Sequence, residues 1–343
     1  MTGLNIFRRT ARGFCSGPLD VVFSDDEIVD QAFHYFRKIG FPYVVLPVHV
    51  CMQELNKLAS SNNDSLLRTV VAYKVANSYH PHRFHGRYHT NKKSIYENFM
   101  DDDFLRSCLR RTLELKGIKA LWIEGLAWHR VHMLSNFRPG FALFLYRRFC
   151  KPGAVVLDTS TGYGGRLVGF LASECGRYIG IDPNVDTYAG NLRMVKDFGR
   201  EKDVELWNLP VEDVAVDEFR ERCDFAFTSP PYFCTEVYSE AESQSCNRYI
   251  GGEDWKTGFL LPMMQLQYES LKPGSFSCVN IADVQIKSTL YPLVRWSIEC
   301  ALKAGFSHVG TKNYPMHHRL GHRKDTNLPV VEKREPVLIF RKE

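Results

Sequence analysis

The sequence has little of what marks membrane-spanning, secreted or repetitive proteins. No apolar run approaches the ~18 residues that a transmembrane helix needs, and the best run, 43–52, is interrupted by Pro47 and His49. The 10 cysteines are scattered and form no C-x-x-C pair, which disfavours both a zinc ribbon and a secreted disulfide framework. Internal repeats and low-complexity segments are missing as well. These absences favour a globular intracellular protein, cytoplasmic or, in a eukaryote, nuclear or mitochondrial.

Acidic residues are scarce in one part of the chain. Residues 1–130 hold 18 lysines and arginines against 13 acidic residues, whereas residues 131–343 hold 26 of each. The stretch 65–96 has no acidic residue and includes Arg83 and Arg87. Such a block is typical either of a surface that faces phosphates or of an ordinary solvated face.

A second acid-free block, 312–324, contains Arg319 and Arg323. If the substrate is nucleic acid, we expect both blocks to contribute phosphate contacts. Four histidines between positions 80 and 89 are spaced by 2, 3 and 4 residues, which does not match a regular zinc-ligand pattern. We therefore expect a basic, partly stacked surface there and no metal site.

The pattern of apolar residues changes along the chain. Residues 24–40 and 94–116 have the caps and apolar stripes of helices, with short strands expected near 43–50. From about residue 131, short apolar runs alternate with helical stretches, as in a parallel, doubly wound sheet. We predict a mainly helical, basic N-terminal extension (1–130) that contributes to substrate recognition, and an α/β domain (131–343). The expected strands of this domain are Ala154–Leu157, Tyr178–Ile181, Val204–Trp207, Phe225–Thr228, Ser277–Ile281 and Val337–Phe340. The last of them follows a long loop at 311–336. The expected helices cover 140–150, 165–174, 186–198, 255–271 and 289–304.

A glycine-rich turn follows the first of these strands. It reads D-T-S-T-G-Y-G-G-R from Asp158 onward and leads into a predicted helix. Gly162 and Gly164 suit a backbone that turns tightly and approaches a ligand, although the G-x-G-x-x-G of dinucleotide sites is absent. Asp182 ends the next predicted strand, where a carboxylate can accept hydrogen bonds from both hydroxyls of a ribose. The pattern predicts a nucleoside site.

Two consecutive prolines, Pro230 and Pro231, follow the fourth predicted strand. They cannot continue a central strand, so they form a stiff turn at the sheet edge where ligands bind in open α/β folds. The Ser229 hydroxyl and the Pro230 carbonyl can each accept one N–H of a planar NH₂ group, which localises the nitrogen lone pair. Tyr232 can stack on a planar substrate, and Phe233 follows it. This combination predicts chemistry at a planar amino nitrogen.

These segments resemble the class I S-adenosylmethionine-dependent amino-methyltransferases. The turn D-x-x-x-G-x-G-G resembles motif I of that family, with Asp182 as the acid of motif II. S-P-P-Y resembles motif IV, (D/N/S)-P-P-(Y/F), and its serine form is most similar to DNA cytosine-N4 methyltransferases. The aspartate form more often accompanies adenine N6. The resemblance covers about residues 135–343 and implies a Rossmann-like class I methyltransferase sheet with S-adenosyl-L-methionine as cofactor.

The resemblance also implies roles for individual residues. N-F-R-P-G at 136–140 is similar to motif X, which closes over the methionine end of the cofactor, and an acid after the third strand often accepts from the adenine amino group. Glu212 and Asp213 both fit the latter position, and a helix cap explains them equally well. Phe233 is expected to face the sulfonium cation. The implied cofactor residues are Asp158, Thr159, Gly162, Gly164, Asp182, Glu212, Asp213, Arg138 and Pro139; the implied catalytic residues are Ser229, Pro230, Pro231 and Tyr232; and the expected substrate residues are Phe233, Arg83, Arg87, Arg319 and Arg323.

Two departures from the family pattern bear on the substrate. Ser160 occupies a position that is usually aromatic in DNA amino-methyltransferases, and no large target-recognition insert is visible. The leading hypothesis is methyl transfer to an exocyclic amino group of DNA, at cytosine N4 or adenine N6. The alternative is N-methylation of an Asn or Gln side-chain amide in a protein or peptide, because amide and cytosine present the same planar NH₂. A binding protein without catalysis is disfavoured by the intact glycine, aspartate and serine set.

Overall fold

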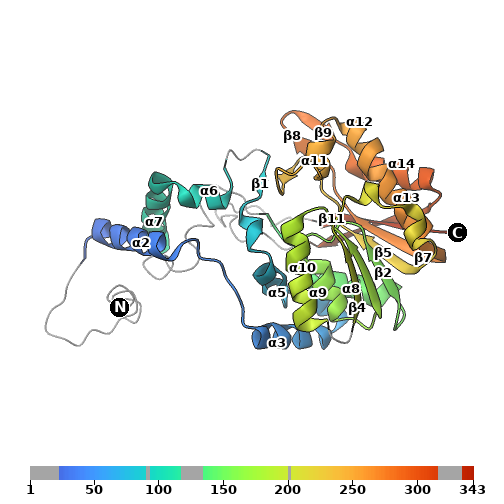
Figure 1. Cartoon of the computed structure of the whole chain (residues 1–343), viewed down its shortest axis with the longest axis horizontal. Helices are drawn as coiled ribbons and strands as arrows, with labels where there is room; N and C mark the ends of the chain where they lie inside the picture. Colours follow the sequence, from blue (N-terminus) through green and yellow to red (C-terminus); the bar gives the residue numbers. More distant parts are fainter. Residues whose placement is uncertain (1–22, 90–92, 117–133, 200–201, 316–333) are drawn as a thin grey trace, which may run out of the picture. The chain divides into compact units, whose positions relative to one another are not determined.

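The computed structural model describes residues 23–89, 93–116, 134–199, 202–315 and 334–343 (Figure 1). The chain divides into two compact units. The first combines residues 1–43 with 84–134, and the second combines 44–83 with 135–343. The helices are α2 (Asp25–Ile39), α3 (Val48–Ala59), α4 (Asn63–Leu66), α5 (Tyr73–Tyr79), α6 (Ile95–Met100), α7 (Asp102–Lys116), α8 (Pro139–Phe149), α9 (Gly165–Leu171), α10 (Val185–Phe198), α11 (Ser245–Arg248), α12 (Gly252–Trp255), α13 (Leu261–Ser270) and α14 (Leu293–Ala304). The strands are β1 (Arg87–Tyr88), β2 (Val155–Asp158), β3 (Arg177–Ile181), β4 (Asp203–Trp207), β5 (Cys223–Thr228), β6 (Glu236–Val237), β7 (Leu271–Asn280), β8 (Val284–Ile286), β9 (Thr289–Tyr291), β10 (Ser307–Pro315) and β11 (Arg334–Arg341).

The described part of the first unit is mainly helical and includes the short strand β1. Ser24 and Glu27 form a capping box at the start of α2, and Gly40, with φ of 78°, ends that helix. The predicted helix at 94–116 is divided into α6 and α7, because Asp101 caps α6 with extended backbone and its carboxylate accepts the Phe104 amide. The core between these helices consists of Val29, Ala32, Phe33, Phe36, Phe99, Leu105 and Leu109.

The second unit is built on a seven-stranded sheet with the order β10-β11-β7-β5-β2-β3-β4. Neighbouring strands from β7 through β4 are parallel, and β11 lies antiparallel to both β7 and β10. The sheet and its flanking helices confirm the predicted fold class, a Rossmann-like α/β fold with a helical N-terminal region. No helix in the described ranges is both long and apolar enough to cross a membrane.

Both faces of the sheet are covered by helices. Alternate residues of a strand point to opposite faces: Val156 belongs to the cluster that includes residues of α8 and α9, and Leu157 to the cluster that includes residues of α13 and α14. Burial on both faces explains why the strands are nearly continuous apolar runs.

The six predicted strands correspond to β2, β3, β4, β5, β7 and β11, but β10 lies partly in the expected loop. Val309, Thr311 and Lys312 are exposed, as expected for an edge strand, so the segment lacks the apolar pattern by which strands are found. Its partner β11 lies beyond residue 333 in the chain. The short strands expected near 43–50 are also not formed: residues 42–47 have no regular structure and α3 starts at Val48.

The two compact units do not coincide with the predicted division of the chain at residue 130. Helices α3, α4 and α5 contribute Leu55, Leu58, Leu66 and Val75 to the same hydrophobic cluster as α8 and α9. The Arg138 side chain also donates to the Leu67 carbonyl over 2.6 Å. Residues 44–83 therefore belong to the sheet-bearing unit, although their own pattern is that of ordinary amphipathic helices.

Candidate cofactor and catalytic site

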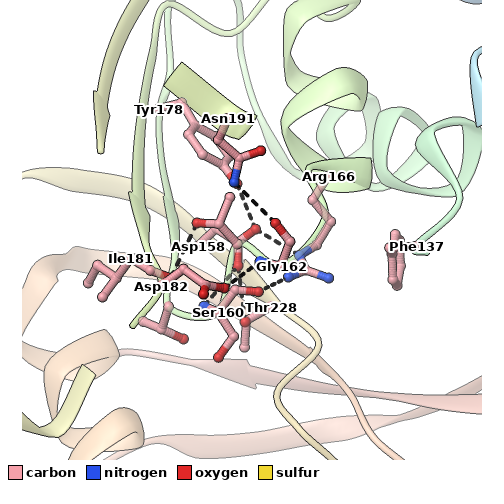
Figure 2. Close-up of polar contacts among 12 residues, drawn as sticks. Phe137, Asp158, Ser160, Gly162, Arg166, Tyr178, Ile181, Asp182, Asn191 and Thr228 are labelled. Atoms are coloured by element: carbon pink, nitrogen blue, oxygen red, sulfur yellow. Dashed lines mark hydrogen bonds and ion pairs between the residues drawn. The ribbon is translucent and has the colours of Figure 1, made fainter. Parts of the chain in front are cut away.

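The candidate site lies at one edge of the sheet. Strands β2, β3 and β5 run parallel, so their carboxyl ends meet at the same edge, which is where ligands bind in open α/β sheets. Asp158 ends β2, Asp182 follows β3, and Thr228 ends β5. Figure 2 shows these three residues grouped around Gly162. The structure thus brings together the glycine-rich turn, the ribose-binding candidate and the start of the S-P-P-Y turn.

The glycine-rich turn requires its glycines. Gly162 and Gly164 have φ values of 56° and 73°, in the left-handed region that favours glycine. A side chain at Gly164 would place its Cβ 2.5 Å from Asn191 Oδ1. The Asn191 amide in turn donates to the Gly162 carbonyl over 3.1 Å. The backbone conformation accounts for both glycines, and the close approach of α10 is a second reason for Gly164.

Asp158 lies beneath the turn and is fully buried. Its Oδ2 accepts from Arg166 Nε and from the Tyr178 hydroxyl, both at 2.7 Å. Its Oδ1 accepts from the Ser160 amide at 3.2 Å and from the Thr228 hydroxyl at 3.1 Å. With four protein donors and no exposed surface, this carboxylate supports the turn from below. The geometry therefore favours a structural role for Asp158 over the predicted contact with a cofactor.

Arg166 is a buried residue that the sequence prediction did not single out. Its side chain is 4 % exposed, pairs with Asp158 and also donates to the Ser160 carbonyl. The guanidinium carbon lies 5.1 Å from the centre of the Phe137 ring. An arginine directly after two glycines of the turn was the available sequence signal, but only the packing shows that it points inward.

Asp182 is positioned as an acceptor. Its Oδ2 accepts from the Gly162 amide at 2.8 Å and its Oδ1 from the Asn184 amide at 3.0 Å. Burial raises the pKa of Asp182 to about 6, although these two backbone donors act in the opposite direction. Both donors are neutral amides, so further hydrogen-bond donors would stabilise the ionised form of this side chain.

Thr159 is also buried at this edge. Its hydroxyl accepts from the Gln267 side-chain amide at 2.9 Å, and the Gln267 carbonyl accepts from the Ser277 hydroxyl at 2.6 Å. This chain of buried polar groups connects the turn to α13 and β7. Like Asp158, Thr159 is placed to hold the turn in position.

Glu212 and Asp213 lie in a short 3₁₀ turn, Val211–Asp213, after β4. Arg248 pairs with both, at 3.3 Å from Glu212 and 2.8 Å from Asp213. The Glu212 side chain is 5 % exposed and that of Asp213 is 42 % exposed, and burial raises the pKa of Glu212. The pair connects the end of β4 to α11, in the segment that follows the S-P-P-Y turn.

The S-P-P-Y turn starts directly after β5 and has no regular secondary structure. Ser229, Pro231 and Tyr232 are partly exposed and Pro230 is buried. Burial, followed by the charge of Glu335, raises the pKa of the Tyr232 hydroxyl well above its ordinary value, and hydrogen bonding from Ser229 opposes the rise. Tyr232 therefore stays neutral at physiological pH and presents an uncharged aromatic ring.

Phe233 occupies a different position from the one expected. It has a φ of 52° and is only 3 % exposed. Its ring packs against Tyr291 and Trp255, at centroid distances of 4.7 and 5.7 Å. The residue anchors the end of the S-P-P-Y turn in the core, which is a packing role and not an exposed contact surface.

The segment that resembles motif X packs against the turn. The Asn136 amide nitrogen donates to the Tyr163 carbonyl over 2.7 Å, and a Cβ at Gly165 would lie 2.1 Å from the Phe137 carbonyl. Arg138 caps α8 and Pro139 is its first residue. Asn136 and Phe137 thus make the contacts to the turn, whereas Arg138 bonds to the Leu67 carbonyl.

The basic residues expected to meet phosphate are placed unevenly. Arg83 is 8 % exposed, and burial lowers its pKa, so it does not form part of an open basic surface. Arg87 lies in β1 of the first unit and is partly exposed. Arg319 and Arg323 lie outside the described residues.

The histidines of the same block do not all lie on the surface. His80 is fully buried, its Nδ1 lies 2.8 Å from the Ala76 carbonyl, and burial lowers its pKa to about 3. His85 stacks on Tyr96 with a centroid distance of 4.1 Å. The expected stacking is therefore found at His85, whereas His80 belongs to the interior beside the glycine-rich turn.

Comparisons with known proteins found solved structures that resemble this chain, but no match by sequence. No family model matches the chain, and no curated protein matches it. The [4+2]-cyclase SpnF shares 11 % identity, with a TM-score of 0.42 over 60 % of this chain and 81 % of that one. A SAM-dependent methyltransferase of Methanosarcina mazei shares 11 %, with a TM-score of 0.39 over 58 % of this chain and 96 % of that one. The 1,6-didemethyltoxoflavin-N1-methyltransferase of Burkholderia thailandensis, with bound S-adenosylhomocysteine, shares 16 %, with a TM-score of 0.38 over 59 % and 76 %.

Proposed function

We propose that this chain is an S-adenosylmethionine-dependent N-methyltransferase that acts on an exocyclic amino group of a nucleic-acid base, cytosine N4 or adenine N6 in DNA. One observation carries the proposal. The glycine-rich turn and the S-P-P-Y turn leave neighbouring parallel strands at the same edge. The Asp158 carboxylate accepts from the Ser160 amide of the first turn and from the hydroxyl of Thr228, the residue directly before the second. A nucleoside-binding turn and an acceptor pair for a planar NH₂ are thus held side by side.

The residues present fit the cofactor. Gly162 and Gly164 carry no side chain and hold the turn in its left-handed conformation. A Cβ at Gly162 would meet only the Ser160 carbonyl, at 3.7 Å. Asp182 offers a carboxylate that two ribose hydroxyls can share. Glu212 or Asp213 would accept from the adenine amino group. Bound there, S-adenosylmethionine supplies an electrophilic methyl group.

This chain's own residues contribute to the reaction by orienting the target nitrogen of the substrate. The Ser229 hydroxyl and the Pro230 carbonyl accept the two N–H groups of the target nitrogen, which turns its lone pair away from the ring. The two prolines keep this pair of acceptors rigid. Tyr232 holds the planar substrate by stacking, worth about 1–3 kcal/mol for a base. Holding the nitrogen in line for attack accounts for much of the rate enhancement in such reactions.

A base in a duplex must leave the stack to reach the turn. We therefore expect DNA to bind with the target nucleotide extruded toward Ser229 and Tyr232. The phosphate contacts would come from basic residues such as Arg87, Arg319 and Arg323, with no direct contribution from the buried Arg83. DNA binding should accordingly weaken as the salt concentration rises.

The amide of an Asn or Gln side chain is the second candidate substrate. The charges of Glu335 and Glu236 both raise the pKa of the Tyr232 hydroxyl, whereas the charge of Arg166 lowers it. Negative charge beside the turn repels phosphate and is compatible with a neutral amide on a basic peptide. Binding that does not change with salt would favour this candidate.

The test identifies the methylated product directly. Purified protein is incubated with S-adenosylmethionine carrying a deuterated methyl group and with DNA, RNA or peptide pools, and hydrolysates are analysed by mass spectrometry. We expect labelled N4-methylcytosine or N6-methyladenine from DNA. The matched controls are Ser229→Ala, which should lose the product, and Ser60→Ala, an exposed serine in the cap of α3, which should retain it. Labelled amide in the peptide pool alone would replace the nucleic-acid substrate by the second candidate.

A further inference from the structure

Asp158 connects two turns that are distant in sequence. Its Oδ1 accepts from the Ser160 amide, at the start of the glycine-rich turn, and from the Thr228 hydroxyl, immediately before Ser229. Asp158 and Thr228 are both fully buried, so the bond between them is not exchanged for water. One oxygen atom therefore fixes the distance between the backbones of the two turns (Figure 2).

The position of Thr228 in β5 makes this contact important. The ladder between β5 and β7 ends at the pair Thr228 and Val279, and the residues that follow have no regular structure. The Thr228 side chain is thus the last bonded group of the strand before Ser229. A displacement of about 1 Å at a reacting group is enough to cost on the order of 10²-fold in rate.

We propose that Thr228 is a positioning residue: its hydroxyl, held by Asp158, transmits the arrangement of the glycine-rich turn to Ser229. The inference rests on the proposed function, because the turn is taken as the cofactor site. Ordering of residues 159–166 by S-adenosylmethionine orders Ser160, and through Asp158 it orders Thr228 and the S-P-P-Y turn. Because Thr228 is fully buried, we assign its effect to the bond with Asp158 and not to contact with substrate or cofactor.

The chain offers a matched control for this role. Tyr178 also donates a fully buried hydroxyl to Asp158, at 2.7 Å, but to the other oxygen and from β3. Tyr178→Phe and Thr228→Val each remove one buried donor to the same carboxylate, with comparable structural cost. Only Thr228→Val breaks the connection to Ser229. Thr228→Ser keeps the hydroxyl, and Thr228→Cys supplies a weaker donor should the valine variant fail to fold.

The experiment measures amide hydrogen exchange by mass spectrometry with and without saturating S-adenosylmethionine. In the wild type, the cofactor should slow exchange in residues 159–166 and in residues 229–235, where the Thr235 amide donates to the Tyr232 carbonyl over 3.2 Å. In Thr228→Val, the slowing in 159–166 should remain, while that in 229–235 should fall by about tenfold. Thr228→Ser should restore it, and Tyr178→Phe should keep it.

Kinetics on the DNA substrate give a second measurement. Thr228→Val should lower kcat by about tenfold or more and leave the Kd for S-adenosylmethionine within about twofold, whereas Tyr178→Phe should change both little. Equal losses in the two variants, or normal protection of 229–235 in Thr228→Val, would overturn the positioning role while leaving the proposed function intact. If the cofactor does not protect 159–166 in the wild type, the proposed function fails, and the inference with it.

Discussion

At the scale of single residues, Asp182 makes cofactor binding sensitive to pH. Burial holds the pKa of this carboxyl at about 6, so in the free protein it gains a proton as the pH falls through 6. Ribose hydroxyls donate to the ionised form. Protonation therefore competes with binding, and the affinity is highest above pH 6.

We expect the Kd for S-adenosylmethionine to rise by about tenfold between pH 7 and pH 5, because each pH unit below the pKa costs a factor of about ten. Isothermal calorimetry at a series of pH values measures this, with circular dichroism as the check on folding. Asp182→Asn should bind weakly at every pH and lose the dependence. A constant Kd in the wild type over this range would exclude Asp182 as the ribose acceptor.

Ser229 is the residue on which the proposed chemistry depends most. Ser229→Ala removes one of two acceptors of the amino group and should lower kcat by about 10²-fold, as removal of one preorganised polar group does in other enzymes. The Kd for the cofactor should not change, since the hydroxyl lies outside the glycine-rich turn. Steady-state kinetics and calorimetry separate the two effects.

Tyr232 provides the comparison for that variant. Tyr232→Phe keeps the aromatic face and should be mild, whereas Tyr232→Ala should also raise KM, because it removes a stacking surface. Normal turnover by Ser229→Ala on the identified substrate would contradict the mechanism.

At the scale of secondary-structure elements, the start of α9 packs very closely against the segment that precedes α8. Gly165 lies against the Phe137 carbonyl, and a Cβ there would approach this oxygen to 2.1 Å. A backbone atom cannot move aside as the end of a flexible side chain does. The glycine is thus required by the packing of α9 against the segment before α8.

Gly165→Ala should lower the free energy of unfolding by about 3 kcal/mol, the upper end of the usual cost of overpacking, and should weaken cofactor binding by displacing the turn. The control is Gly274→Ala, at a glycine with φ of 81° where an added Cβ would have no neighbouring atom within 4 Å, which should cost about 1–2 kcal/mol through backbone strain alone. Urea denaturation measures both. Equal losses would show that Gly165 is not constrained by Phe137.

At the scale of the whole molecule, the sheet depends on helices α3, α4 and α5, which lie well before its first strand in the chain. Helices α3, α4 and α5 bury Leu55, Leu58, Leu66 and Val75 in the cluster beneath α8 and α9. Tyr79 also donates to Asp197 over 2.6 Å. The sheet without these helices would expose part of its own core.

A truncated chain of residues 131–343 should therefore fold poorly, because each of the four buried side chains that it lacks contributes about 1.5–3 kcal/mol, and a typical domain has a stability of only about 5–15 kcal/mol. Thermal denaturation followed by circular dichroism should show a broad or missing transition where the full chain gives a cooperative one. Cooperative unfolding of 131–343 at the same temperature would show that residues 44–83 are an accessory layer.

The local features of this protein could be predicted from its residues alone. Alternating apolar runs predicted six of the seven strands of the main sheet, because buried strands are apolar wherever they stand. Gly162, Gly164, Asp182 and the S-P-P-Y turn were also visible, since each is marked by a residue type with a special backbone or chemical property. What remained was placement: Arg166, Asp158 and Thr228 form one buried network, Phe233 and Arg83 are packed inside, and residues 44–83 join the sheet. These points could be established only from the three-dimensional fold, because burial and pairing depend on partners far away in the chain. An arginine or a histidine looks the same in sequence whether it faces solvent or the core.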